Sequence, residues 1–152
     1  MADNADLIKL YSGRILALAA DIPHHSRLGT PQISVKRRSP LCGSTVIVDL
    51  DMQDGRVTRF GQDVKACALG QAAAAILGQV VLGRSAEELA IAREQLHAML
   101  TSGGPVPDAP FEGFEVLLPA QEYRNRHASI LLALDATVEA SKQLLTQSTS
   151  AL

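Results

Sequence analysis

The sequence predicts an α+β fold in which helices pack on one face of a small three-stranded antiparallel sheet. Two runs rich in β-branched residues, 44–52 and 56–64, are joined by a turn containing Asp54 and Gly55, which is a strong hairpin signal. After residue 65 the composition changes to Ala-rich and Leu-rich segments with helical spacing. The order of one helix, then strands, then helices is typical of an α+β domain.

The chain is predicted to form a single domain over residues 1–152, with frayed tails at 1–4 and 146–152. Hydrophobic residues make up 47% of the sequence, which is enough to bury a core without help from disulfides. Because aromatic residues are only 3% and Trp is absent, we expect a core of small aliphatic side chains.

The elements up to the hairpin follow from local signals. A first helix is predicted from a cap at Asp3 or Asn4 to about Ala20, and Pro23 stops it. Residues 33–39 alternate weakly between apolar and polar side chains, and their basic residues are typical of an edge strand that avoids further pairing. With the hairpin, this strand completes a sheet of three antiparallel strands.

Helices are predicted after the sheet. Residues 66–83 form an Ala-rich helix, with Gly83 at the position of a C-terminal cap. Ser85 and Glu88 have the spacing of a capping box, which starts a helix over 86–102.

The segment 105–119 contains several prolines, so it is predicted to be a surface connection with at most a short turn of helix. The last helix is predicted from Tyr123 to Leu145, because apolar residues recur there at helical spacing.

Charge and hydropathy exclude two classes of partner. The formal net charge of −2 provides no global field for holding nucleic acid or an anionic membrane. No run approaches the roughly 18 apolar residues of a membrane helix. The apolar run 14–20 follows Asp3 and Asp6, so it is typical of an amphipathic helix and not of a signal peptide. Two cysteines without an export signal indicate a cytoplasmic protein with free thiols.

The two cysteines lie at the open end of the predicted hairpin. Cys42 is in the turn that enters the second strand, and Cys67 is in the first turn of the Ala-rich helix, just after the third strand. Because antiparallel strands bring the start of one beside the end of the other, we expect the two thiols to converge. The helix N-terminus favours the thiolate of Cys67 and lowers its pKa. Ordinary core packing of both thiols is the competing interpretation.

Two thiolates are half of a tetrahedral site for a soft metal, and the other ligands would be His, Asp or another oxygen donor. The sequence offers several candidates, and composition does not choose among them: Ser44, Asp63, His24, His25, His97 and His127. Of these, His127 lies near the start of the last helix between Arg124 and Arg126, whereas His97 has the position of a partly buried helix residue.

Three segments resemble the signature regions of the U-type iron–sulfur cluster scaffold family, which comprises IscU, SufU and the N-terminal domain of NifU. They are "SPLCGS", "DGRVTRFGQDVKACALGQAAAAILGQVVLGRSAEEL" and "YRNRHASILLALDAT". The family patterns are P-x-C-G-D on a loop, G-C-A-x-S-x-A-S at a helix start, and a basic P-x-R/K-x-x-C near the last helix. The resemblance spans about residues 6–140 in the same order.

Three positions depart from these patterns. Ser44 replaces the Asp after the first cysteine, Leu69 replaces the Ser after the second, and His127 replaces the third cysteine. The resemblance therefore implies that Cys42 and Cys67 are metal ligands and that His127 is a substituted ligand. The fourth or transient ligand is expected to be one of two residues, Ser44 or Asp63.

The resemblance implies a scaffold without turnover of its own, which binds iron, a [2Fe–2S] cluster or zinc. Sulfur would come from a cysteine desulfurase, and the cluster would pass to acceptor proteins. Arg124 and Arg126 are expected either to dock an acidic partner or to hold the thiolates electrostatically, although they also fit a solvated helix start.

Three other functions stay open from the sequence. They are zinc-dependent sulfur transfer of the SufU type, a nucleophilic enzyme in which His127 activates Cys67, and a degenerate member that only binds partners. No motif for an oxyanion hole accompanies the Cys/His pair, which disfavours the enzyme. The sequence also leaves a homodimer open.

Overall fold

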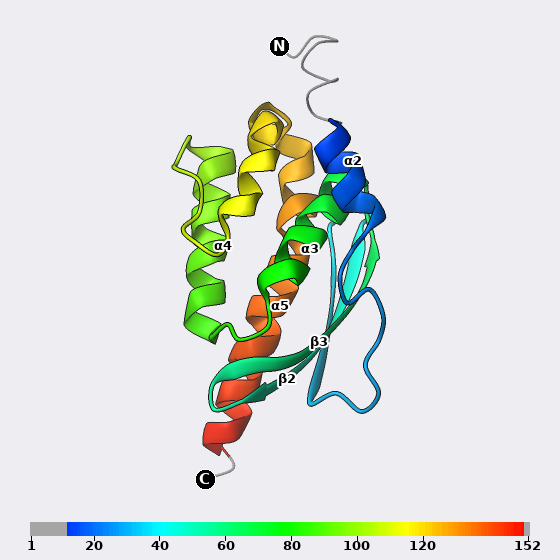
Figure 1. Cartoon of the computed structure of the whole chain (residues 1–152). Helices are drawn as coiled ribbons and strands as arrows, with labels where there is room; N and C mark the ends of the chain where they lie inside the picture. Colours follow the sequence, from blue (N-terminus) through cyan, green and yellow to red (C-terminus); the bar gives the residue numbers. More distant parts are fainter. Residues whose placement is uncertain (1–11, 151–152) are drawn as a thin grey trace.

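The computed structural model describes residues 12–150 and confirms the predicted α+β fold (Figure 1). Its elements are α2 (Gly13–Ala20), β1 (Ile33–Arg38), β2 (Thr45–Gln53), β3 (Arg56–Lys65), α3 (Ala68–Val80), α4 (Ala86–Thr101), the 3-10 helix η1 (Glu112–Glu122) and α5 (Arg124–Ser150). The predicted cap at Asp3 or Asn4 lies outside the described residues. Within them, α2 begins after Ser12, whose hydroxyl accepts the N–H of Ile15 at 3.4 Å.

The sheet has the strand order β1-β2-β3, and both pairs are antiparallel. In the register, Val48 of β2 faces Val35 on one side and Gln62 on the other. Val46, Val48 and Leu50 are buried, and the long helix α5 packs across β1 and β2 (Figure 1). The helices therefore cover one face of the sheet, as predicted from the sequence.

The opposite face is covered by the segment between α2 and β1. Asp49 of β2 points to this side and is fully buried. Its carboxylate accepts two hydrogen bonds from the Arg27 guanidinium, at 2.7 and 3.1 Å, and one from the N–H of Leu28 at 2.9 Å. The hydroxyl of Ser34 donates to it as well. A buried carboxylate needs such partners, so Asp49 fastens this segment to the sheet.

Helix α3 lies in the middle of the helical layer, between α2, α5 and η1 (Figure 1). Its alanines at 72–75 are all buried, and their small side chains let the neighbouring helices approach closely. The helix ends at Val80, before the predicted C-terminal cap at Gly83. Gly83 has a φ of +86°, and its N–H binds the carbonyl of Val57 at 2.8 Å, so this residue turns the chain toward α4 instead.

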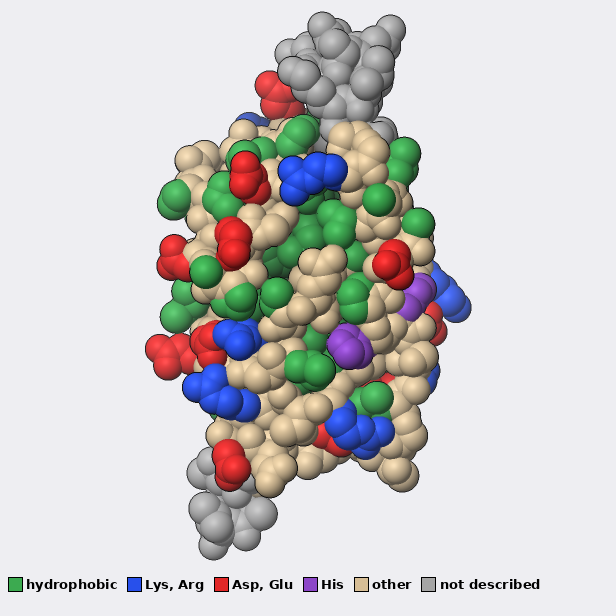
Figure 2. All heavy atoms as spheres, in the orientation of Figure 1, with side chains coloured by type: hydrophobic (Ala, Val, Ile, Leu, Met, Phe, Trp, Pro, Cys, Tyr) green, Lys and Arg blue, Asp and Glu red, His purple; other side chains and the backbone are tan. Residues whose placement is uncertain are grey.

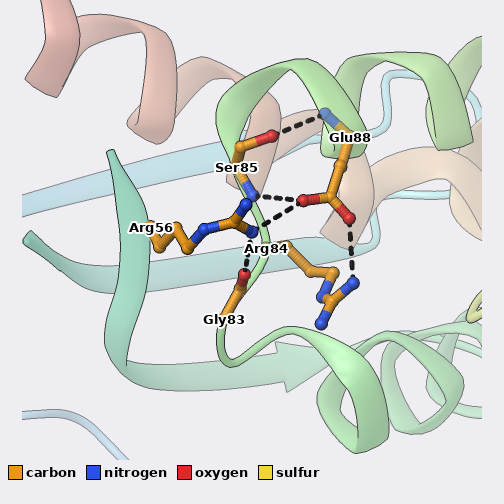
Figure 3. Close-up of polar contacts among 5 residues, drawn as sticks. All are labelled: Arg56, Gly83, Arg84, Ser85 and Glu88. Atoms are coloured by element: carbon orange, nitrogen blue, oxygen red, sulfur yellow. Dashed lines mark hydrogen bonds and ion pairs between the residues drawn. The ribbon is translucent and has the colours of Figure 1, made fainter. Parts of the chain in front are cut away.

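The capping box at the start of α4 is confirmed (Figure 3). The Glu88 N–H donates to the Ser85 hydroxyl at 3.1 Å, and the Ser85 N–H donates to the Glu88 carboxylate at 3.2 Å. Two guanidinium groups bind the same carboxylate, that of Arg56 at 3.0 Å and that of Arg84 at 2.8 Å. Arg56 also donates to the carbonyl of Gly83 at 2.8 Å. This network connects the start of β3 to the start of α4.

The segment 105–119 is a mostly exposed connection only as far as residue 110, so the prediction of a surface connection was wrong for its second half. It leads into η1, where Phe114, Val116, Leu117 and Ala120 are buried against the other helices. Pro119 lies within η1 and is exposed, while the apolar residues of this helix form its inward side. Helix α5 also runs past the predicted end at Leu145 to Ser150, since no Gly or Pro interrupts it.

The face seen in Figure 2 carries acidic and basic side chains that are interspersed with one another. Within residues 12–150, no helix combines the length and the apolar character that crossing a membrane requires.

Candidate functional site

Cys42 lies in the tight loop between β1 and β2. The loop is closed by two backbone hydrogen bonds, from Gly43 N–H to the Ser39 carbonyl at 2.9 Å and from Ser39 N–H to the Ser44 carbonyl at 2.8 Å. Gly43 has a φ of +73°, a conformation that glycine adopts without strain. The Cys42 side chain is exposed at the surface. The loop therefore presents this thiol to solvent on a short, hydrogen-bonded support.

Two serine hydroxyls surround the sulfur of Cys42. The Sγ atom lies 3.3 Å from the Oγ of Ser39 and 3.1 Å from the Oγ of Ser44. Hydrogen bonding with these two serines, of which Ser39 makes the largest contribution, lowers the pKa of Cys42 to about 7. A substantial part of this thiol is therefore ionised at neutral pH, and the thiolate is both the nucleophile and the metal ligand.

Cys67 is the N-cap residue of α3 and is half-buried. Burial by itself would raise its pKa, because the charged form loses water. The N–H groups of Gly70 and Leu69, the Ser129 hydroxyl and the Arg126 side chain outweigh that effect, so the pKa of Cys67 lies below its ordinary value. The sequence predicted that the helix N-terminus lowers the pKa of Cys67, and the direction of this shift is confirmed.

A pair of buried serines links the two cysteines. The Oγ of Ser44 lies 3.1 Å from the Oγ of Ser129 on α5, which in turn lies 3.6 Å from the Sγ of Cys67. With the contact between Cys42 and Ser44, the polar groups form a continuous chain from one sulfur to the other. The thiols thus converge at the open end of the hairpin, and both are free cysteines.

His127 is placed differently from the sequence-based expectation. Its side chain is only 7% exposed, and its Nε2 atom lies 2.8 Å from the carbonyl oxygen of Ala120 at the end of η1. An α-helix advances about 100° per residue, so His127 and Ser129 point to different sides of α5. Ser129 faces the thiols and His127 faces η1.

The structure does not bring together the three expected ligands, Cys42, Cys67 and His127. Within residues 12–150, no three His, Cys, Asp or Glu side chains lie close enough together to hold a metal ion. The structure therefore does not group Cys42 and Cys67 with either His127 or Asp63. Asp63 is paired with Ile47 in the sheet, and its charge acts on Arg27, which belongs to the segment that precedes β1.

The other candidate residues have clear positions. Ser44 is at the site, in contact with Cys42. Arg126 interacts with Cys67, as one of the two predicted roles requires, whereas Arg124 is exposed to solvent. The remaining histidines are elsewhere: His24 packs edge-on against Phe60, His25 accepts the N–H of Val64, and His97 is a half-buried residue of α4, as predicted.

Sequence reasoning missed Ser39 and Ser129. A signal for Ser129 was present in α3, where Gly70 interrupts an Ala-rich helix. A Cβ atom at Gly70 would lie 2.6 Å from the Ser129 hydroxyl oxygen and 2.8 Å from the Ala66 Cβ. A glycine that departs from a run of alanines indicates a close approach of another element, and here that element is the part of α5 that carries Ser129.

These residues supply half of a soft-metal site. Zinc and iron–sulfur clusters are usually held by four thiolate or imidazole ligands. One chain provides two thiols here, and the neighbouring serine hydroxyls are weak ligands for such metals. The arrangement suits the chemistry of thiolates: accepting sulfur and binding a soft cation through two sulfur atoms.

Comparison with known proteins found several solved structures that are similar to this chain. No protein-family model and no curated protein matches the chain. A nitrogen-fixing NifU-like protein (N-terminal) from Brucella abortus is similar, with 39% sequence identity and a TM-score of 0.90 over 93% of this chain and 98% of that one.

Two more distant structures share the fold. One is described as a candidate iron–sulfur cluster assembly scaffold for the SUF system of Fervidobacterium islandicum AW-1, with 15% identity, a TM-score of 0.78, and coverage of 88% of this chain and 98% of that chain. The other is a hypothetical protein with 20% identity, a TM-score of 0.76, and coverage of 89% and 98%. The identity and coverage of the Brucella structure show that this chain belongs to the family of NifU-like proteins, N-terminal domain.

Proposed function

We propose that this protein is a scaffold for iron–sulfur cluster assembly that holds its cargo on Cys42 and Cys67. One observation carries the proposal: the chain of hydroxyls from Cys42 through Ser44 and Ser129 to Cys67, which keeps the two thiols together at the surface. Family membership and the shared fold of the SUF-system structure support it. A scaffold carries a cluster and has no turnover of its own.

The exposed thiol is suited to receive sulfur from a cysteine desulfurase. The Cys42 thiolate would attack the outer sulfur of the desulfurase persulfide, so that a new S–S bond forms on Cys42 and the desulfurase cysteine leaves as a thiolate. An external reductant must then supply two electrons to release sulfide for the cluster. Since Cys42 has a pKa of about 7, much of it is a thiolate when the persulfide arrives.

Arg126, which acts on Cys67, and Arg124, an exposed residue at the start of α5, would favour an acidic partner surface. In this proposal the partners are the desulfurase, which delivers sulfur, and acceptor proteins, which take the finished cluster.

Anaerobic reconstitution tests the scaffold. The chain is incubated with ferrous iron and sulfide, and the sulfur-to-iron charge-transfer absorption is followed. Cys42→Ser and Cys67→Ser should each abolish cluster uptake, whereas His97→Ala, on α4 away from the thiols, should leave it unchanged. Uptake that survives both cysteine changes would place the cluster elsewhere and refute the proposal.

Zinc-dependent sulfur transfer of the SufU type is a second candidate, favoured by the exposed Cys42 thiol, whose pKa of about 7 suits it to accept persulfide sulfur. In this case ³⁵S from labelled cysteine and a desulfurase should appear on Cys42 without bound iron. A chain that accepts the label and binds zinc, but takes up no cluster, supports transfer. A chain that does neither supports the degenerate member that only binds partners.

A further inference from the structure

The two thiols differ in how far solvent reaches them. Cys42 is exposed on the β1–β2 loop, whereas Cys67 is half-buried at the start of α3. A sulfur donor that comes from outside the protein therefore reaches Cys42 first. A sulfur atom that stays on Cys42 is equally open to thiols in solution, which remove it again by exchange.

The Ser129 hydroxyl lies between the two sulfurs. Its Oγ atom is 3.6 Å from the Sγ of Cys67, and the same hydroxyl interacts with the sulfur of Cys42. The sheet register agrees with this placement. Extended by two residues beyond its last pair at the open end of the hairpin, it would put Gly43, the neighbour of Cys42, opposite Cys67. The two free thiols are therefore neighbours that share one hydroxyl contact.

The surroundings of Cys67 suit a second, protected sulfur atom. The N–H groups of Leu69 and Gly70 hydrogen-bond its sulfur. The Ser129 hydroxyl and the Arg126 side chain act on the same atom. Such donors stabilise negative charge on sulfur, whether the anion is a thiolate or the terminal sulfur of a persulfide. The half-buried position therefore favours an anionic sulfur and limits the access of thiols from solution.

We propose that Cys67 is the second acceptor in a sulfur relay: the sulfur atom that Cys42 receives passes on to Cys67 of the same chain. The Cys67 thiolate attacks the outer sulfur of the Cys42 persulfide. A new S–S bond forms on Cys67, the bond from that sulfur to Cys42 breaks, and Cys42 leaves as a thiolate. The transferred sulfur keeps its oxidation state, so this step needs no reductant. The inference rests on the proposed function, which loads sulfur on Cys42.

The serine hydroxyls also account for the proton of this step. Where Cys67 is a thiol, it loses its proton as its sulfur attacks, and Cys42 gains one as it departs. The hydroxyls of Ser129 and Ser44 connect the two sulfurs through contacts of 3.6, 3.1 and 3.1 Å. Each hydroxyl accepts one proton and donates another. The proton therefore travels in the direction opposite to the sulfur, and the net charge of the site is unchanged.

A pulse of persulfide tests the relay in the full chain. The reduced protein receives a substoichiometric amount of glutathione persulfide without oxygen, and samples are alkylated at intervals before they are unfolded and digested with trypsin. The two cysteines then lie on separate peptides, residues 39–56 and 66–84, because each is flanked by Lys or Arg cleavage sites. Mass spectrometry locates the extra sulfur. We expect it first on the Cys42 peptide and then on the Cys67 peptide, while the sum of the two stays constant.

Four variants make the test specific, and circular dichroism confirms that each is folded. Cys67→Ser should hold the extra sulfur on Cys42. Cys42→Ser should take up sulfur at least about tenfold more slowly, because the half-buried thiol must then meet the donor directly. Ser129→Ala should slow the migration by about tenfold, the effect of a lost hydrogen bond to a charged group, and should change the loading of Cys42 much less, since Ser129 contributes least to that thiol. Ser141→Ala removes another buried hydroxyl of α5 and should behave like the unmodified chain.

Sulfur that stays on Cys42 in the unmodified chain would overturn the relay and leave the scaffold proposal standing, and this time course needs no variant. Sulfur that reaches Cys67 equally fast in Cys42→Ser would also overturn it, because the atom would have come directly from solution. Release of sulfide, with the two peptides joined by a disulfide, would mean that Cys67 attacks the inner sulfur instead. Absence of sulfur from both cysteines would overturn the relay together with sulfur receipt, whereas reconstitution with iron and sulfide tests the scaffold independently.

Discussion

The hydroxyl oxygens of Ser44 and Ser129 lie 3.1 Å apart, although the two residues are 85 positions apart in the sequence. Ser44 is 5% exposed and Ser129 is 2% exposed, so this contact is shielded from water. Because each serine also contacts one cysteine sulfur, the pair connects the β1–β2 loop to α5 and sets how the thiols face each other.

Removal of the Ser129 hydroxyl should weaken both the fold and the activation of Cys67. We expect Ser129→Ala to lower the free energy of unfolding by about 1 kcal/mol, because Ser44 loses a buried hydrogen-bond partner. It should also raise the pKa of Cys67, which Ser129 lowers. Urea unfolding and the pH dependence of alkylation measure the two effects. Ser141→Ala is the matched control, since Ser141 is another buried serine of α5 and bonds the Val138 carbonyl. It should change stability only.

The reactivity of Cys42 should rise through neutral pH. In a Cys67→Ser background, the rate of alkylation by iodoacetamide should increase with pH around a midpoint of about 7. Ser39→Ala should move the midpoint upward, because the Ser39 hydrogen bond is the largest cause of the lowered pKa. At pH 7 the variant should therefore react more slowly, while at pH 10 the two proteins should react alike. A midpoint at the ordinary thiol value of about 8.5 in both would show that the serines do not stabilise the thiolate.

A third thiol should strengthen metal binding at position 129 and not at position 127. Ser129→Cys places a sulfur beside both cysteines, so we expect the affinity for Zn²⁺ to rise at least about tenfold, as expected for an added soft ligand. His127→Cys places it toward Ala120 and should leave the affinity unchanged. Competition with a chromophoric chelator measures both. A larger gain at position 127 would mean that α5 presents the other side to the thiols when metal is bound.

Gly70 should not tolerate a methyl group. Ala is favoured over Gly in a helix by about 1 kcal/mol, but a Cβ here would lie 2.6 Å from the Ser129 hydroxyl oxygen. We expect Gly70→Ala to destabilise the protein by about 1 to 3 kcal/mol, the usual cost of overpacking, and to shift the reactivity of Cys67. Gly13→Ala in α2 is the control, because within residues 12–150 no atom outside the adjacent part of its own helix would lie within 4 Å of its Cβ. Equal stability of the two variants would show that α3 and α5 can separate freely at this point.

The sheet and the meeting of the two cysteines were predictable from the sequence. The β-branched runs and the Asp54-Gly55 turn specify a hairpin by local preferences alone, and the capping box of Ser85 and Glu88 is likewise a local pattern. Once the hairpin is antiparallel, the residues before its first strand and after its second must lie together. For this reason Cys42 and Cys67 converge regardless of how the helices pack.

The identity of the residues that complete the site was decided only by tertiary packing. Periodicity shows that the start of α5 is helical, but it does not show which side of the helix meets α3. That choice depends on η1, which sequence reasoning had placed at the surface and which instead packs into the core and binds His127 through the Ala120 carbonyl. Because His127 faces η1, Ser129, which lies two residues further along the helix, faces the thiols. A helix side is selected by contacts between segments distant in the sequence, which local patterns do not contain.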